Sequence, residues 1–232
     1  IIEPVVQGAA GMITQPTGFL STIWKIAKKN GLLFIADEVA TGFGRTGTMF
    51  ACEKEGIRPD FLCVAKSITG GYLPLAATLT TDEVFRGFLG KFEDFKTFFH
   101  GHTYTGNPLA CSVALRNLEL YNEENLIDRM KDKIALLKKE LQRFYLLSHV
   151  GEIRHEGFMV GIELVKNKKT KKAYPPKERI GHKVIIEARK RGVVIRPLGD
   201  VVVLMPPLAI DEATLKKLID VTYESIEVVT GL

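Results

Sequence analysis

Cysteine is scarce in this sequence, and its positions do not suit a disulfide framework or a zinc site. The 232 residues include three cysteines, Cys52, Cys63 and Cys111, and no two of them stand in a C-x-x-C spacing. An odd number of scattered cysteines does not fit a secreted domain held together by paired disulfides. We therefore expect a protein of the reducing cytoplasm.

Long hydrophobic runs and a strong excess of one charge are also absent. No stretch approaches the about 18 consecutive apolar residues that indicate a membrane-spanning helix, and the net charge is only +5. One basic run, Lys-Asn-Lys-Lys-Thr-Lys-Lys, occupies residues 166–172. A solvated loop is the simplest interpretation of this run, and a nucleic-acid or membrane patch is the alternative. The composition predicts a globular protein with neither nucleic acid nor membrane as a partner.

The first half of the chain alternates short apolar runs with amphipathic segments. We expect strands at residues 1–6, 32–38, 61–66 and 75–80, and helices at residues 17–30 and 51–55. Alternation of strand and helix is typical of an α/β architecture. Because the chain opens directly on an apolar, strand-like run without an initiator methionine, we expect it to begin inside a domain.

After Pro108 the pattern changes to longer helices and a separate group of strands. We expect helices at residues 109–121, 125–145, 178–191 and from 212 onward, with strands at residues 159–165, 193–196 and 201–205. Asp211 stands where it can cap the last helix. The change predicts two domains, with residues 1–122 in a larger α/β domain and residues 123–232 in a smaller α+β domain.

Two of the expected strands end on charged residues. Residues 32–38 end in Asp37 and Glu38, and residues 61–66 end in Lys66. If the two strands are parallel, Asp37 and Lys66 emerge at the same carboxyl edge, where open α/β sheets bind ligands. A buried lysine beside a buried aspartate is costly unless the two are paired or used in chemistry.

The use that fits this pair is binding of pyridoxal phosphate. Lys66 would join the aldehyde as an imine, and Asp37 would face the pyridine nitrogen and keep it protonated. Released by an incoming amine, Lys66 would become the base that moves a proton from the substrate carbon. The simpler alternatives are a turn or helix-cap role for Asp37 and a surface position for Lys66.

A glycine-rich segment at residues 42–47 matches the pattern G-x-G-x-x-G. In a dinucleotide-binding fold the first glycine follows the strand directly and the last one opens a helix. Here residues 38–41 intervene, no good helix follows, and the next strand ends in Lys66 instead of an acid. We therefore reject the dinucleotide interpretation.

Two further segments carry polar groups that suit anions. Residues 100–108 contain two histidines, hydroxyls and glycines. A metal site at His100 and His102 is weakly supported because no third ligand is spaced nearby, and an oxyanion such as phosphate suits the segment better. Arg196 stands in an otherwise apolar hairpin, where a grip on a carboxylate and a structural salt bridge are equally good interpretations.

Taken together, these motifs resemble the class III aminotransferases, which are pyridoxal-phosphate enzymes of fold type I. The resemblance rests on residues 37–47 and 65–71 and extends over nearly the whole chain. Residues 100–108, 196–199 and 204–207 are similar to the branch of the class that converts 8-amino-7-oxononanoate to 7,8-diaminononanoate in biotin biosynthesis, usually with S-adenosylmethionine as the amino donor. The resemblance implies a partial large domain of mostly parallel sheet followed by a smaller α+β domain.

The resemblance also implies roles for individual residues. The cofactor would be bound by Asp37, Val39, Lys66, His102 and Thr103, with Asp37 and Lys66 also catalytic. Val39 would pack on the ring, and Thr103, with His102 beside it, would reach the phosphate of the neighbouring subunit's cofactor. The implied assembly is therefore a homodimer with shared active sites.

The small-molecule substrates would be 8-amino-7-oxononanoate and an amino donor. The resemblance assigns Gly101, through its backbone, and Arg196, through its guanidinium, to the first of these, with Lys66 meeting both. A bound metal is not part of this prediction.

Several alternatives stay open at this point. The chain could be a class III ω-aminotransferase with another substrate, or an enzyme that takes lysine as its donor. Because family members are roughly twice as long, we expect this chain to be the C-terminal half of such an enzyme, without the first half that carries the other strands of the large domain. A non-catalytic fragment is therefore the remaining alternative.

Overall fold

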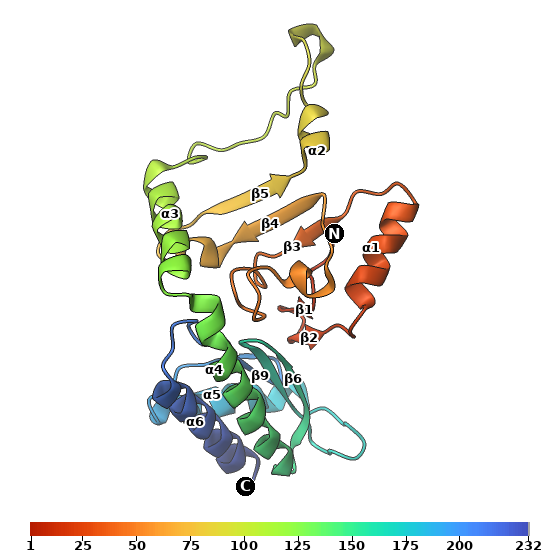
Figure 1. Cartoon of the computed structure of the whole chain (residues 1–232). Helices are drawn as coiled ribbons and strands as arrows, with labels where there is room; N and C mark the ends of the chain where they lie inside the picture. Colours follow the sequence, from red (N-terminus) through yellow and green to blue (C-terminus); the bar gives the residue numbers. More distant parts are fainter. Residues whose placement is uncertain (232) are drawn as a thin grey trace.

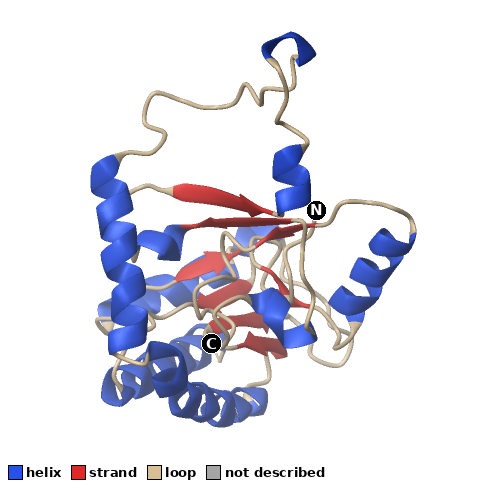
Figure 2. Ribbon diagram, turned by 45° about the horizontal axis from the view of Figure 1, so that its top comes forward, coloured by secondary structure: helices blue, strands red, loops and turns tan. Residues whose placement is uncertain are grey.

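The computed structural model describes residues 1–231, and its strands form two main sheets. Figure 1 shows the first sheet in the upper half of the molecule and the second in the lower half. In this view α3 (Pro108–Glu123) stands at the left of the first sheet, and α4 (Leu126–Glu140) continues downward in front of the second. The strands lie in the middle of the molecule and helices flank them (Figure 2). The α/β architecture expected from the sequence is confirmed.

The first sheet has the order β3-β4-β5, formed by β3 (Ile35–Asp37), β4 (Phe61–Ala65) and β5 (Ala76–Thr80). β3 and β4 are parallel, as the sequence predicts, whereas β5 runs antiparallel to β4. Ile2 extends the sheet through a parallel bridge to Ala36. The other elements of this region are α1 (Phe19–Lys29), η1 (Ala51–Glu55) and the small antiparallel pair β1 (Val6–Gln7) and β2 (Ile13–Thr14).

Two expected strands in this region are shorter than predicted. The strand expected at residues 32–38 begins only at Ile35, because the Leu32 amide donates to the carbonyl of Ala27 and so completes the end of α1. Leu32 and Leu33 are consequently exposed. The strand expected at residues 1–6 is replaced by the single bridge at Ile2, followed by the short β1.

The second sheet is entirely antiparallel and has the order β6-β7-β9-β8. Its strands are β6 (Val150–Glu156), β7 (Met159–Leu164), β8 (Arg196–Leu198) and β9 (Val201–Leu204). The neighbouring helices are α5 (Ile180–Lys190), α6 (Glu212–Thr230) and the short η4 (Leu141–Leu146) and η5 (Pro176–Glu178). Asp211 caps α6 as predicted, since its carboxylate accepts from the Thr214 amide at 2.8 Å.

Two boundaries and one whole strand in this region differ from the sequence prediction. The strand expected at residues 193–196 begins at Arg196, because the Val193 amide is taken by the carbonyl of Ala188 at the end of α5. The helix expected at residues 125–145 tightens into a 3-10 turn after Glu140. β6 was not predicted, because charged residues alternate along it and dilute its apolar pattern.

One hydrophobic cluster crosses the proposed division between residues 122 and 123. It joins Phe43, Val64 and Tyr121 to fully buried side chains of the second sheet and its helices, among them Met130 and Phe158. Burial of such apolar surface is the main stabilising contribution to a fold. The two-domain division therefore stays a prediction, and the two sheets share a core.

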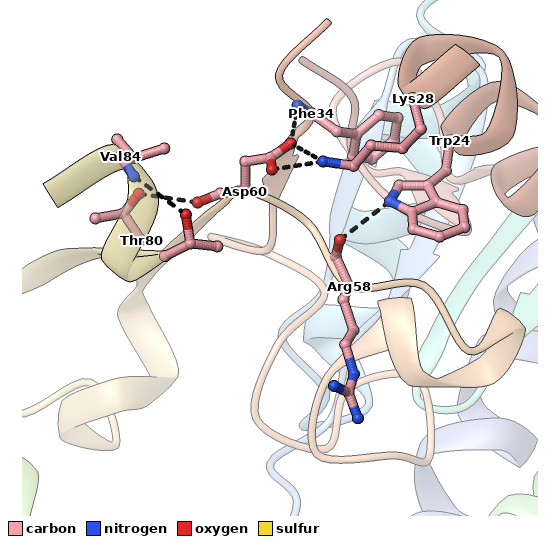
Figure 3. Close-up of polar contacts among 8 residues, drawn as sticks. Trp24, Lys28, Phe34, Arg58, Asp60, Thr80 and Val84 are labelled. Atoms are coloured by element: carbon pink, nitrogen blue, oxygen red, sulfur yellow. Dashed lines mark hydrogen bonds and ion pairs between the residues drawn. The ribbon is translucent and has the colours of Figure 1, made fainter. Parts of the chain in front are cut away.

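Polar contacts fasten the amino edge of the first sheet (Figure 3). Asp60, immediately before β4, accepts from Lys28 Nζ at 2.5 and 2.6 Å and from the Phe34 amide at 2.6 Å. Trp24 Nε1 donates to the carbonyl of Arg58, and Thr80 Oγ1 donates to that of Asp60. Burial alone would raise the pKa of Asp60, but the bonds from Lys28 and Phe34 outweigh it and lower the pKa.

Residues 81–107 form an arm that projects away from both sheets at the top of Figure 1. The arm contains only two short elements, α2 (Asp82–Arg86) and η3 (Phe92–Asp94). Its aromatic side chains are unusually exposed for their size, namely Phe85, Phe88, Phe92, Phe95, Phe98 and Phe99. Among them, only Phe88–Phe98 and Phe92–Phe95 pack ring against ring, in tilted pairs with centroids 5.1 and 6.1 Å apart.

Candidate active site

Asp37 and Lys66 lie at the same carboxyl edge of the first sheet. Asp37 is the last residue of β3 and stands opposite Cys63 of the parallel β4. Lys66 follows Ala65, the last residue of β4. Since parallel strands end on one side of a sheet, the two side chains leave the sheet together, as the sequence predicts.

Lys66 occupies a backbone conformation that L-residues rarely adopt. Its φ is +50°, in the left-handed region, which costs a non-glycine residue roughly 1–2 kcal/mol. It opens the 3-10 turn η2 (Lys66–Thr69), and its side chain is exposed. Strained residues of this kind persist where the surroundings fix them, and they concentrate at functional sites.

The two adjacent acids at the end of β3 have different surroundings. Asp37 Oδ1 accepts from the Val39 amide at 3.1 Å. Glu38 is fully buried, and its two oxygens accept from the amides of Ala51 and Cys52, each at 2.8 Å. Burial raises the pKa of Glu38 in spite of these bonds. Glu38 thus holds the loop after β3, whereas Asp37 takes part in no salt bridge within residues 1–231.

The sequence interpretation missed the inward role of Glu38. A signal for it was present, because successive residues of a strand point to opposite faces of the sheet. Of two consecutive acids at a strand end, one therefore has to turn toward the protein interior. In the described residues Glu38 has no cation near it and is satisfied by backbone amides instead.

The glycine-rich loop at residues 42–47 connects the two sheets and opens no helix. A side chain on Gly42 would lie 2.8 Å from the carbonyl of Glu38, and Gly44 has a φ of +88°. The Tyr121 hydroxyl donates to the carbonyl of Phe43 at 3.0 Å, and burial raises the pKa of Tyr121 to about 12. These contacts confirm that the loop is a tight turn packed on α3 and α4.

Arg45 links the glycine-rich loop to the second sheet. Its guanidinium donates to the carbonyl of Pro206 at 2.6 Å, and its own carbonyl accepts from the Phe158 amide at 2.8 Å. Burial lowers the pKa of Arg45, although a guanidinium stays charged at any physiological pH. The loop after Asp37 is thereby fixed to the segment that follows β9.

Arg196 lies on β8 opposite Val203 of β9, and its side chain is exposed. It borders a mostly apolar cavity of about 540 Å³ whose walls include Val194, Met205, Pro206 and Leu218. No carboxylate of residues 1–231 pairs with Arg196. The anionic partner expected from the sequence is therefore not an acid of the described chain.

Residues 100–107 are held by hydrogen bonds of their own turn, and none of these bonds reaches Asp37 or Lys66. His102 Nδ1 accepts from the Tyr104 amide at 3.2 Å, and Thr105 Oγ1 accepts from the His102 amide at 3.0 Å. Gly101 and Thr103 are exposed. Asn107 caps α3 by accepting from the Leu109 amide at 3.0 Å. The chain thus places Asp37, Val39 and Lys66 at the carboxyl ends of β3 and β4, and Gly101, His102 and Thr103 on the approach to α3.

Two searches over the described part of the chain concern other kinds of site. Between Ile1 and Gly231 there is no group of three histidine, cysteine or acidic side chains placed to hold a metal ion. Over the same residues, no helix combines the length and apolar character needed to cross a bilayer.

The comparison with known proteins agrees with this geometry. The model of the family described as aminotransferase class-III matches residues 1–226. The chain therefore belongs to the class III aminotransferases, whose members depend on pyridoxal phosphate.

The most similar relatives point to one branch of this family. The adenosylmethionine-8-amino-7-oxononanoate aminotransferase of Aquifex aeolicus is 59% identical over 220 residues, which cover 95% of this chain and 49% of the relative. The protein of the same name from Nitratidesulfovibrio vulgaris is 55% identical over 99% of this chain and 42% of its own length. The chain thus spans about half the length of the curated relatives it matches.

The fold is shared with the crystal structure of a further relative. The adenosylmethionine-8-amino-7-oxononanoate aminotransferase of Methanocaldococcus jannaschii superposes with a TM-score of 0.95 at 50% identity, covering 97% of this chain and 52% of that one. The fold type I expected from the sequence motifs is thereby confirmed.

Proposed function

We propose that the protein is a pyridoxal-phosphate-dependent aminotransferase that converts 8-amino-7-oxononanoate to 7,8-diaminononanoate. The observation that carries the proposal is the placement of Asp37 and Lys66 at one carboxyl edge, on neighbouring parallel strands. The names of relatives at 55 and 59% identity support the choice of substrate. S-adenosylmethionine is the proposed donor, in keeping with those names.

The residues present fit the cofactor. Neither Asp37 nor Lys66 is occupied by a salt bridge among residues 1–231, so both are available to a ligand. When bound, the pyridinium ring of the cofactor accepts the electrons released at the substrate carbon. Asp37 would hold the ring nitrogen protonated, and Val39 would pack against the ring.

Lys66 would work twice in each turnover. Its Nζ would hold the cofactor and would be released when the incoming amine takes its place. As a free amine it would then take the proton from the substrate's reacting carbon and pass it to the cofactor. The same movement in reverse serves the second half of the reaction, which predicts ping-pong kinetics.

Arg196 would recognise the carboxylate of 8-amino-7-oxononanoate. A guanidinium binds a carboxylate with two parallel hydrogen bonds. Its exposed position beside an apolar cavity suits a substrate with an acidic end and an aliphatic chain. The backbone of Gly101 would contribute to the same substrate.

A homodimer with shared active sites completes the proposal. Thr103 and His102 form no hydrogen bond with Lys66 in their own chain, and a role at the cofactor phosphate of a second subunit suits them. The exposed phenylalanines of residues 81–107 form an apolar surface of the kind that marks protein interfaces. The unpaired cysteines suit a cytoplasmic biosynthetic enzyme.

Borohydride reduction of the whole protein with pyridoxal phosphate, followed by peptide mass mapping, tests the cofactor site. We expect a pyridoxyl mass on Lys66 and on no other lysine. Label elsewhere, or none, would contradict the assignment. A scan of cofactor absorbance with S-adenosylmethionine, lysine and 4-aminobutyrate then identifies the donor, and conversion only by the last would favour a different ω-aminotransferase.

A further inference from the structure

The turn η2, which begins with Lys66, accepts hydrogen bonds from one side chain of α3. Asn117 Nδ2 donates to the carbonyls of Ser67 at 2.9 Å and Ile68 at 3.1 Å. Both carbonyls belong to η2, directly after Lys66. Within residues 1–231 no other side chain donates to either carbonyl.

The remaining bonds of the turn are local. The Gly70 amide donates to the carbonyl of Ser67 at 3.1 Å, and the Thr69 hydroxyl donates to that of Leu73 at 2.6 Å. These bonds close the far end of the turn but do not fix its position relative to the rest of the fold. Asn117 does so, because it reaches the turn from a helix 50 residues later in the chain.

The amide group of Asn117 also fits closely between the helix and the turn. A side chain on Gly70 would lie 3.1 Å from Asn117 Oδ1, and Gly70 itself has a φ of +61°. Asn117 is half-buried, and Ile68 packs against the main hydrophobic cluster. Movement of α3 would therefore be transmitted to the turn, and loss of the Asn117 amide would free the turn to relax from its left-handed entry at Lys66.

We propose that Asn117 is a positioning residue that fixes the turn at residues 66–69, so that the Lys66 amine is delivered to the cofactor and to the substrate carbon. The inference rests on the proposed function, since Lys66 needs a reaction to serve. Asn117 touches no reacting atom itself. Its effect arises because a displacement of about 1 Å in a reacting group can slow an enzyme by a factor of about 100.

A positioning role differs from a merely structural one in what it changes. Lys66 acts in both halves of the reaction, so a misplaced Lys66 slows both halves by the same factor. The carboxylate of 8-amino-7-oxononanoate is assigned to Arg196, away from this turn, so we expect the concentration of that substrate at half-saturation to change much less than the rates. A side chain that only stabilised the fold would lower the thermal midpoint without altering either rate constant.

The experiment compares three variants in the whole protein. Asn117→Asp keeps the shape but removes the donor and sets a carboxylate against two carbonyls, whereas Asn117→Gln keeps an amide. Asn122→Asp is the matched control, since Asn122 lies on the same helix, is exposed, and its side chain makes no hydrogen bond among the described residues. The measurements are single-turnover rates of both half-reactions, borohydride labelling of Lys66, and hydrogen exchange at residues 67–72 of the cofactor-free protein.

We expect Asn117→Asp to slow both half-reactions equally, on the order of tenfold to a hundredfold. The Gly70 amide should exchange faster, Asn117→Gln should recover part of the rate, and Asn122→Asp should match the wild type. Wild-type rates in a labelled, folded Asn117→Asp protein would overturn the inference. If Asn117→Asp does not fold, Asn117→Ala, which removes both donors without adding charge, decides by the same comparison.

The two proposals fail separately in this experiment. A wild type that takes no label on Lys66 overturns the proposed function. A labelled wild type with Asn117 variants of unchanged rate and unchanged hydrogen exchange overturns only the role of Asn117.

Discussion

An aspartate and a lysine stand at each end of strands β3 and β4, and only the pair at the amino end forms a salt bridge. At the amino edge Asp60, just before β4, takes Lys28 Nζ at 2.5 Å and the Phe34 amide at 2.6 Å. At the carboxyl edge Asp37 and Lys66 enter no salt bridge within residues 1–231. A charge beside an apolar strand is therefore no sign of chemistry by itself. The informative property is whether the chain supplies its partner.

The comparison predicts its largest effect at Lys66. Because Lys66 pairs with no acid of the described chain, Lys66→Ala should leave the fold intact and remove transamination by roughly 10³-fold or more. Steady-state turnover and the thermal midpoint of the whole protein provide the measurements. Lys29→Ala, an exposed lysine of α1 outside any described salt bridge, is the control. Turnover retained in Lys66→Ala would remove the distinction between the two edges.

Arg196 extends the comparison to the second sheet, since it too has no acid partner in the described residues. Arg196→Ala should raise the KM for 8-amino-7-oxononanoate about 10- to 100-fold, the loss of one charge-assisted contact of about 1.5–3 kcal/mol. The donor KM should change much less. Arg189→Ala, an exposed arginine of α5 without a described salt bridge, should change neither. Equal effects of Arg196→Ala on both substrates would contradict the assigned role.

The order of elements was predictable from the sequence where the pattern was local. Apolar runs gave β4 and β7, and the Asn30-Gly31 stop gave the end of α1. The predicted start of a strand was wrong where an apolar residue completes the preceding helix instead of beginning the strand. Leu32 and Val193 both follow a glycine and both complete the preceding helix with their amides. Strand boundaries at such places depend on bonds that an apolar pattern does not reveal.

The candidate site was also predictable only in part. Asp37 and Lys66 could be placed at one edge because strand direction alone determines it. The sequence had no signal for Asn117, whose contact with the turn after Lys66 depends on how α3 packs against the sheet. The roles of Gly101, His102 and Thr103 stay predictions, since their proposed partner is another subunit.

The neighbouring acids Asp37 and Glu38 repeat this comparison at the end of one strand. Asp37 is the acid left for a ligand, and Glu38 is the acid used by the fold. Glu38→Gln keeps one acceptor where two backbone amides point, so it should destabilise the protein by about 1–3 kcal/mol. Denaturant unfolding at neutral pH measures this change, with the exposed Glu53→Gln as control. A stability equal to the wild type would show that the Glu38 contacts contribute nothing.

The salt bridge between Asp60 and Lys28 at the amino edge should have the smallest effect, on the free energy of unfolding, and this effect should depend on pH. The pKa of Asp60 is lowered in the folded protein, so its ionised form favours folding. This contribution is fully present above the pKa of the unfolded carboxyl, about 4, and is lost as pH falls through the lower folded pKa. At neutral pH Asp60→Asn should cost about 1 kcal/mol, because Lys28 is partly exposed and the ion pair is screened by solvent.

Unfolding of wild type and Asp60→Asn at a series of pH values from 7 down to 3 provides the test. We expect the difference in unfolding free energy between the two proteins to shrink steadily below about pH 4, as the wild-type carboxylate is protonated. A difference that stays constant down to pH 3 would mean that the charge of Asp60 does not stabilise the amino edge. The difference between the salt-bridged Asp60 and the unpaired Asp37 would then have only the Lys66 variant as its support.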